Sequence, residues 1–419
     1  MQIIQNKLLN LNNLICIIQK KAVPLRQNLK IMEKITNPFI IQGTIPEAYF
    51  CDREKETERL VRYLTNGENV VLHAVRRIGK SKLIEHCFEQ PAIKGKFYTI
   101  FVDILQTGNL QEFTYEFGKA VFEATASLGN RMMKQFAQIV QSLHTDYTID
   151  PFTGYPKLSM SIGHIENAIY TIEEVFRFLE QADKPCIVAI DEFQRIADYP
   201  EKNVEAILRT HIQRMRNCEF VFAGSDRHLL GQMFQDYNRP FYASAATITL
   251  EKIERSKYIE FVTKHFEEFD KHISPEEVER IYDLFDGNTY AMQKTLNTAF
   301  SITAKTEKCS IETIRQAIDE IIEENDFTYR THLMSIGLSQ KEVLYAIARS
   351  GKAIQITSSA FVGKYRLGSS SSVQSAVRKL KADGWVAEYI NQNGQKYYQL
   401  NDYFLMLWIQ KKYGRGYDI

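Results

Sequence analysis

The stretch that decides the fold is ENVVLHAVRRIGKSKLIEH, residues 68–86. It opens with a short apolar run rich in β-branched residues (Glu68–Val75), which is typical of a buried strand. From Lys80 onward, apolar residues recur at helical spacing. The link AVRRIGKS (Ala74–Ser81) matches the phosphate-binding pattern G-x4-G-K-[S/T], except that alanine stands at the first position. The sequence therefore predicts a nucleotide-binding loop between a strand and a helix.

Each part of this loop has an expected role in binding ATP. Backbone N–H groups and the N-terminus of the following helix would surround the phosphates, and Gly79 allows the backbone to approach them closely. Lys80 is expected to reach the β and γ oxygens, and the Ser81 hydroxyl to bind Mg²⁺. Arg76 and Arg77 face phosphate, are solvated, or pair with acidic neighbours. The predicted nucleotide contacts in the loop are Ala74, Val75, Arg76, Arg77, Ile78, Gly79, Lys80, Ser81 and Lys82.

A second motif, CIVAIDEFQRI (Cys186–Ile196), places two acids after an apolar strand. In a doubly wound parallel sheet, ligands bind at the carboxyl edge of the strands. Asp191 is expected to hold Mg²⁺, and Glu192 to act as the general base that polarises an attacking water. The alternative is a solvated acidic turn. That alternative does not explain why the acids follow a buried strand and a phosphate-binding loop.

Composition and length fit a multidomain globular protein. The chain has 419 residues, of which 44 % are hydrophobic and 25 % charged, so fibrous and disordered classes are excluded. Strands alternate with helical stretches up to residue 253, which predicts a parallel sheet covered on both faces. Residues 144–164 are rich in turn formers and predict an inserted loop or hairpin. The predicted divisions are an extension (1–31), a P-loop domain (32–253), a helical lid (254–326) and a winged helix (327–419).

Charge and cysteine usage suggest a compartment and a partner. The six cysteines form no CxxC pair, which argues against a disulfide scaffold or zinc module and favours the cytoplasm. The sequence contains no run of 18 apolar residues, so it predicts no membrane-spanning helix. The first 31 residues carry five basic groups and no acid, and are interpreted as an upstream extension rather than a targeting signal. The last 89 residues carry twelve Lys or Arg against five Asp or Glu, which favours a polyanionic partner.

With these motifs in place, the chain resembles the prokaryotic P-loop ATPases of the AAA+/STAND superclass, often called the archaeal ATPase family. FCDREKETERL (residues 50–60) resembles the family's box before the first strand, which implies that Asp52, Arg53 and Glu54 are candidates near the base. FVFAGSDRHLLGQMF (residues 220–234) resembles its sensor 1 strand and following helix, which implies that Ser225 lies near the γ-phosphate. The resemblance implies an AAA+-like parallel sheet with a helical lid.

The resemblance extends to the lid and to a candidate arginine finger. DGNTYAMQKTLN (residues 286–297) resembles the family's lid motif, with Thr289 where the family has proline. In AAA+ assemblies an arginine from a neighbouring subunit touches the γ-phosphate, so a homo-oligomer is one implied state. Arg239 and Arg209 are the candidates for this role. The alternative for each is a surface arginine that pairs with an acid.

The last 90 residues predict a winged helix-turn-helix. Three helical stretches are followed by WVAEYINQNGQKYYQL, which is typical of a β-hairpin with Asn393–Gly394 as a two-residue turn. The segment DYFLMLWIQ (Asp402–Gln410) is too apolar for solvent, and the ATPase body is one surface against which it is expected to pack. The third helix is the expected recognition helix. Its candidate contacts to double-stranded DNA are Ser370, Gln374, Arg378, Lys379 and Lys381.

The sequence therefore predicts an α/β P-loop ATPase with a helical lid and a C-terminal winged helix. It is expected to bind and hydrolyse ATP with Mg²⁺ and to couple nucleotide state to the winged helix. One alternative, favoured by Ala74 and Thr289, is a DNA-binding regulator with little hydrolysis. Another is a scaffold in stress or phage defence whose winged helix binds protein. A small-molecule kinase is disfavoured by the third domain.

Overall fold

The computed structural model describes residues 35–125, 147–149, 156–158, 168–391, 393–414 and 416–417. The predicted extension, residues 1–31, lies outside the described residues. The central sheet has five strands in the order β2-β5-β6-β1-β7, and every pairing is parallel. This confirms the predicted α/β class. The strands are β1 (Val70–Ala74), β2 (Tyr98–Asp103), β5 (Cys186–Asp191), β6 (Cys218–Gly224) and β7 (Ala246–Leu250).

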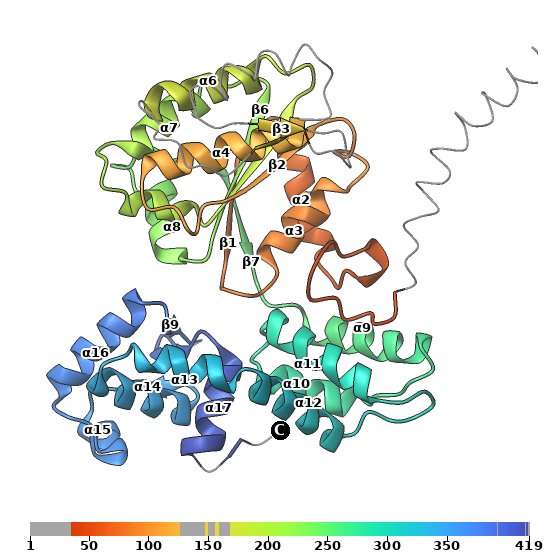
Figure 1. The fold of residues 1–419 in the computed structure, drawn as a ribbon, viewed down its shortest axis with the longest axis vertical. Helices are drawn as coiled ribbons and strands as arrows, with labels where there is room; N and C mark the ends of the chain where they lie inside the picture. Colours follow the sequence, from red (N-terminus) through yellow and green to blue (C-terminus); the bar gives the residue numbers. More distant parts are fainter. Residues whose placement is uncertain are drawn as a thin grey trace, which may run out of the picture.

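Helices cover both faces of this sheet (Figure 1). Side chains of a strand alternate between faces, so Val70 and Leu72 pack with α2 and α3 while Val71 joins the cluster on the opposite face. One face carries α2 (Glu54–Thr65) and α3 (Lys80–Phe88). The other carries α4 (Leu110–Thr125), α6 (Ala168–Glu180), α7 (Val204–Ile212), α8 (Arg227–Gln235) and the 3-10 helix η2 (Phe193–Asp198).

Two smaller elements lie outside these layers. The 3-10 helix η1 (Glu47–Tyr49) precedes α2. Strands β3 (Tyr147–Ile149) and β4 (Pro156–Leu158) pair antiparallel, and so form the hairpin predicted within the 144–164 stretch.

The strand order positions the two nucleotide motifs. Strand β6 lies between β1 and β5, so the phosphate-binding loop after β1 and the acids at the end of β5 flank the end of β6. Because all the strands run parallel, their carboxyl ends meet at one edge.

The remaining helices form a lower layer in Figure 1, with the lid on one side and the winged helix on the other. The lid consists of α9 (Arg255–Glu268), α10 (Pro275–Leu284), α11 (Thr289–Ile302) and α12 (Ile311–Glu324). The winged helix consists of α13 (Asp326–Met334), α14 (Leu338–Ser350), β8 (Ala353–Ile354), α15 (Ser359–Tyr365), α16 (Ser370–Ala382), β9 (Val386–Ile390), β10 (Lys396–Leu400) and α17 (Tyr403–Tyr413).

The three helices α14–α16 and the β9–β10 hairpin confirm the winged-helix prediction, and β8 completes a sheet in the order β8-β10-β9. The predicted two-residue turn at Asn393–Gly394 is wrong. Strand β9 ends at Ile390 and β10 begins at Lys396, so a longer loop connects them. In this loop the Asn391 side chain accepts from the N–H groups of Asn393 and Gln395, which supports a wider turn than the two-residue form.

The lid and the winged helix share one continuous hydrophobic cluster. It includes Tyr258 of α9, Leu296 of α11, Leu344 of α14 and Trp408 of α17, each at most 1 % exposed. The apolar segment at the end of the chain forms α17, whose main helical packing partners are α12 and α14. A movement of the lid is therefore expected to carry the winged helix with it. Within the described ranges, no helix combines the length and hydropathy needed to cross a membrane.

Candidate nucleotide-binding site

The phosphate-binding loop takes its shape from two left-handed residues. Ala74 is the last residue of β1 and pairs with Leu250 of β7, so the alanine at the first motif position sits in ordinary strand backbone. The positive φ angles fall at Arg77 (65°) and Gly79 (94°). A Cβ on Gly79 would meet no protein atom within 4 Å, so within the chain itself the positive φ is what calls for glycine.

Lys80, Ser81 and Asp191 meet where β1 and β5 end. Lys80 Nζ lies 2.6 Å from Asp191 Oδ1, and both side chains are 8 % exposed. Ser81 Oγ donates to Asp191 Oδ2 at 2.6 Å. A hydroxyl beside a carboxylate is an all-oxygen donor set of the kind that Mg²⁺ prefers, with phosphate and water as its other ligands. The carboxylates of Asp191 and Glu192 offset the charge of the buried Lys80 side chain.

Glu192 is held by donors from three directions. Its Oε1 lies 3.3 Å from Lys80 Nζ, and its Oε2 accepts from Ser225 Oγ at 2.8 Å and Gln194 Nε2 at 2.5 Å. Burial alone would raise the pKa of Glu192. The charge of Lys80 and the bonds from Gln194 and Ser225 outweigh burial and lower that pKa below its usual value. Glu192 is therefore ionised, as a general base requires.

The sequence did not predict two residues that lie near Asp191 and Glu192, namely Asp103 and Gln194. Asp103, the last residue of β2, lies in register with Asp191. Burial first, and then the charges of Asp191 and Glu192, raise the pKa of Asp103. Gln194 contacts Glu192 directly. The available signals were an acid at the end of a predicted strand and a glutamine two positions after the base.

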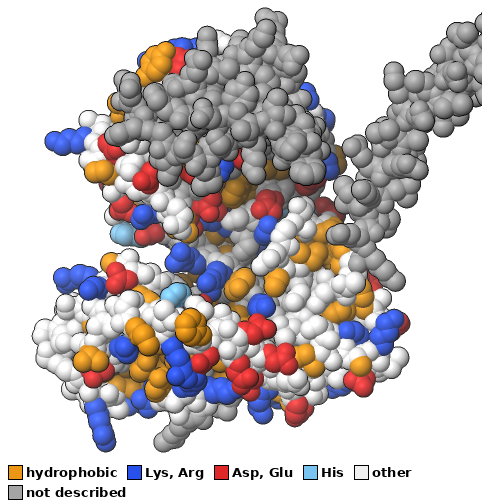
Figure 2. Space-filling model, viewed as in Figure 1, with side chains coloured by type: hydrophobic (Ala, Val, Ile, Leu, Met, Phe, Trp, Pro, Cys, Tyr) orange, Lys and Arg blue, Asp and Glu red, His pale blue; other side chains and the backbone are white. Residues whose placement is uncertain are grey.

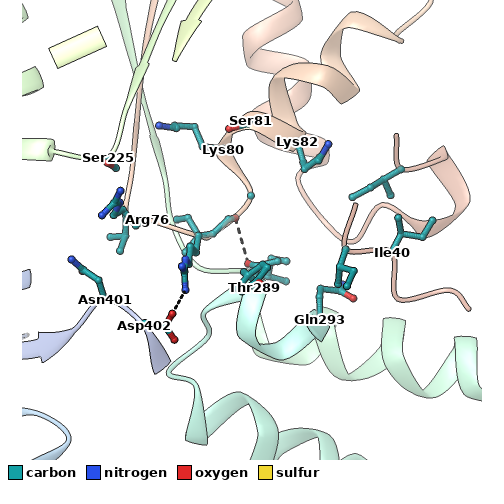
Figure 3. Close-up of a pocket in the computed structure, with 18 of the residues that line it drawn as sticks. Ile40, Arg76, Lys80, Ser81, Lys82, Ser225, Thr289, Gln293, Asn401 and Asp402 are labelled. Carbon is teal, nitrogen blue, oxygen red and sulfur yellow. Dashed lines mark hydrogen bonds and ion pairs between the residues drawn. The ribbon is translucent and has the colours of Figure 1, made fainter. Parts of the chain in front are cut away.

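A cavity of about 540 Å³ opens beside the loop and is lined by all three parts of the chain. Figure 3 shows Lys80, Ser81 and Ser225 on one side of it, Thr289 and Gln293 from the lid, and Asn401 and Asp402 from the winged helix. Gln293 Oε1 is buried without a hydrogen-bond partner in the described part of the chain. Six lining residues from the segment before α2 are mostly apolar and were not predicted: Ile40, Ile41, Ile45, Tyr49, Phe50 and Cys51. An apolar wall with an unpaired amide oxygen fits a nucleotide base.

The two residues predicted near the base lie in different places. Arg53 lines the cavity, is 4 % exposed and approaches the Ile78 carbonyl at 3.5 Å. Asp52 is not among the lining residues and pairs with Lys257 of α9 at 2.7 Å. Burial would raise the pKa of Asp52, but the bond from Lys257 lowers it below its usual range. Asp52 thus links the body to the lid. Lys82 lies at the cavity edge and donates to the Gly43 carbonyl at 2.9 Å.

The lid and the winged helix contact the phosphate-binding loop directly. Tyr290 N–H donates to the Arg77 carbonyl at 3.0 Å, and Thr289 Oγ1 donates to the Ile78 carbonyl at 3.4 Å. A proline at position 289 would lack that hydroxyl. Arg77 Nη1 lies 3.3 Å from Asp402 Oδ2 of the winged helix, and the guanidinium carbon lies 5.0 Å from the centre of the Tyr290 ring. Figure 2 shows the hollow between the sheet domain and the lower layer, with basic side chains within it.

Arg239 lies outside the residues that line the cavity. Its Nη2 pairs with Glu205 Oε1 of α7 at 2.6 Å. Its predicted role concerns a neighbouring subunit, and remains a prediction.

The DNA candidates share the exposed side of α16. Ser370, Gln374, Arg378, Lys379 and Lys381 are all exposed, while Val373, Ala376, Val377 and Leu380 are buried on the opposite side. Gln374, Arg378 and Lys381 also line a groove of about 480 Å³ against the wing. In this groove Glu388 of β9 pairs with Lys381 at 2.7 Å and with Lys396 at 2.8 Å.

Comparisons with known proteins agree with this architecture. A family model described as an ATPase domain predominantly from Archaea matches residues 50–295, and a model described as a probable winged helix domain matches residues 327–411. No curated protein matches the chain significantly.

Solved structures with the same fold cover nearly the whole chain. A Walker-type ATPase of Pyrococcus abyssi is 18 % identical, with a TM-score of 0.57 over 89 % of this chain and 99 % of that one. The ORC2 protein of Aeropyrum pernix in its ADP form is 16 % identical, with a TM-score of 0.51 over 90 % and 97 %. The ORC1 protein of the same organism, in complex with DNA, is 14 % identical, with a TM-score of 0.50 over 90 % and 97 %.

Proposed function

Since the chain belongs to the family of ATPase domains predominantly from Archaea, we propose that it is an AAA+/STAND-type switch that binds and hydrolyses ATP and couples nucleotide state to its winged helix. The observation that carries this proposal is the composition of the cavity. The phosphate-binding loop, the lid and the winged helix all line it, so a bound nucleotide would contact all three.

The chemistry follows from the residues around Glu192. The loop N–H groups and Lys80 bind the β and γ phosphates, and Ser81 and Asp191 are the residues that would hold Mg²⁺. Bound Mg²⁺ would neutralise charge on the phosphates. Glu192 accepts the proton of the attacking water, and Ser225 beside it orients the γ-phosphate.

ATP turnover by the purified chain tests this proposal. Wild type is compared with Lys80→Ala, which removes the phosphate contact, and with Glu192→Gln, which removes the base but keeps its size. We expect Lys80→Ala to lose both ATP binding and turnover, and Glu192→Gln to retain binding and lose turnover by about 100-fold. Turnover that survives in Lys80→Ala would refute the proposal. Tight ATP binding without turnover in wild type would favour the regulator with little hydrolysis.

We also propose that the exposed side of α16 binds double-stranded DNA. The support is the basic side of this helix, the groove that it forms with the wing, and the fold shared with a protein solved in complex with DNA. Arg378→Ala should weaken binding to duplex DNA and flatten its dependence on salt. Retention of no DNA even at low salt would instead favour a protein partner.

An oligomer completed by Arg239 is a separate proposal. An arginine at the edge of one subunit would stabilise charge on the γ-phosphate in the next subunit. Mixing Arg239→Ala with Lys80→Ala chains tests it. Each variant lacks one half of a shared site, so mixed assemblies should regain turnover that neither variant shows alone, whereas independent subunits would regain none.

A further inference from the structure

We infer that Gln194 is a positioning residue for ATP hydrolysis, which fixes the carboxylate of Glu192 so that one oxygen faces the phosphate-binding loop. This inference rests on the proposed function, because it concerns the orientation of the proposed base. It goes beyond that proposal by assigning a role to a buried amide of the second motif, in which only Asp191 and Glu192 had a predicted role.

The first observation is how the two oxygens of Glu192 are divided. Oε2 accepts from Gln194 Nε2 at 2.5 Å and from Ser225 Oγ at 2.8 Å. Oε1 faces the loop, where Lys80 Nζ lies 3.3 Å away. If Lys80 turns toward bound phosphates, Oε1 becomes available to an attacking water while Oε2 stays anchored. Oriented groups of this kind lose rate steeply when they shift by about 1 Å.

The second observation is that Gln194 is held at an energetic cost. The residue is 7 % exposed, and its Oε1 is buried without a hydrogen-bond partner in the described part of the chain. Reversing the amide would place its oxygen against Glu192 Oε2, and two acceptors repel. An orphaned buried carbonyl destabilises the fold, so we infer that the arrangement is maintained for the bond that the amide nitrogen makes.

The third observation is that the neighbouring strand leaves room for this amide. A Cβ on Gly224, the last residue of β6, would lie 2.1 Å from Gln194 Oε1. Gly224 directly precedes Ser225, the second donor to Glu192. The end of β6 therefore supplies one donor and the space that the other requires.

Two substitutions displace the amide by different routes. Gln194→Met keeps the size of the side chain and removes the donor. Gly224→Ala keeps the glutamine, but its new methyl group displaces the side-chain amide. The matched control is Gly231→Ala in α8, where the nearest atom to a new Cβ would be 3.9 Å away. We expect kcat to fall about tenfold in Gln194→Met and Gly224→Ala, with the Kd for ATP changed less than about twofold. Gly231→Ala should keep both constants.

A double-substitution cycle separates positioning from general damage. If Gln194 acts through Glu192, adding Gln194→Met to Glu192→Gln should reduce kcat no further, because the group that it positions is already gone. Melting temperatures of all variants identify any loss of folding. A wild-type kcat in Gln194→Met would overturn the inference, as would multiplicative losses in the double variant, while the proposed function would stand. Absence of turnover in wild type would overturn both.

Discussion

Arg77 contacts both the lid and the winged helix, and so connects the phosphate-binding loop to each of them. Its backbone is left-handed, with φ of 65°, which costs a non-glycine residue about 1 kcal/mol. The carbonyl accepts from the lid at Tyr290, and the guanidinium pairs with Asp402 of the winged helix. Asp402 uses its other oxygen, Oδ1, to cap α17 by accepting from Leu405 N–H at 3.0 Å. A phosphate group that enters the loop would compete with Asp402 for Arg77.

This competition predicts the effect of Asp402→Asn. Asparagine caps helices as well as aspartate does, so α17 should persist while a negative charge leaves the cavity. We expect ATP to bind about fivefold more tightly, since an anionic ligand no longer competes with a carboxylate. Isothermal titration calorimetry measures this. The control is Asp226→Asn, which alters the cap of α8 without lining the cavity. Equal affinities in wild type and Asp402→Asn would contradict the prediction.

Glu219 of β6 gives a prediction about stability and pH. Burial raises its pKa from 4.5 to about 7, and its Oε2 is buried without a hydrogen-bond partner in the described chain. The folded state therefore binds more protons than the unfolded state between about pH 4.5 and 7, and stability falls as pH rises through that window. Glu219→Gln should match wild type near pH 4.5 and exceed it at pH 8 by about 1 kcal/mol, after allowance for solvent screening. Urea unfolding at both pH values measures it, and an equal gain at both would count against it.

At the scale of elements, α16 and the wing carry opposite charges that pair with each other. Glu388 on β9 bonds to Lys381 of α16 and Lys396 of β10, and these bonds lower its pKa to about 2. Glu388 is therefore ionised at neutral pH, and masks two of the cations that a phosphate backbone would need.

Glu388→Gln should therefore strengthen binding to duplex DNA. We expect affinity to rise about threefold to tenfold at low salt, and the plot of log affinity against log salt to steepen by about one. Fluorescence anisotropy at several salt concentrations measures both. Glu342→Gln on α14 changes the net charge equally but leaves the groove lining unchanged, and serves as control. The same gain in both variants would indicate a general charge effect rather than this groove.

At the scale of the whole molecule, the buried hydrophobic residues form three clusters. Two lie on the faces of the sheet, and the third runs from the lid through the winged helix. Because α17 packs against α12 and α14, the lower layer is expected to unfold as one unit.

Leu407→Ala on α17 tests whether the lid and the winged helix unfold together. Leu407 is fully buried, and its truncation should cost about 2–5 kcal/mol. Hydrogen exchange followed by mass spectrometry should show faster exchange in α9–α12 as well as in α13–α16, with β5 and β6 unchanged. Faster exchange confined to residues 327–419 would show that the lid and winged helix unfold separately.

The sequence alone determined the features whose signals are local. The strand–loop–helix around Lys80, the acids after β5 and the helices and hairpin of the winged helix depend on residues close together in the chain. The width of the turn after β9 was predicted wrongly, since side-chain bonds from Asn391 favoured a longer loop.

Tertiary structure decided which distant residues complete the site. Asp103 meets Asp191 because β2 and β5 are neighbours, an order that strand patterns do not contain. Asp402 reaches Arg77, and Asn288 reaches the Arg76 carbonyl across 212 positions, because the lid and winged helix share one core that docks on the loop. Local periodicity determines which face of an element is buried. Which element covers that face depends on packing over the whole molecule. The same packing brings together the residues that line the cavity.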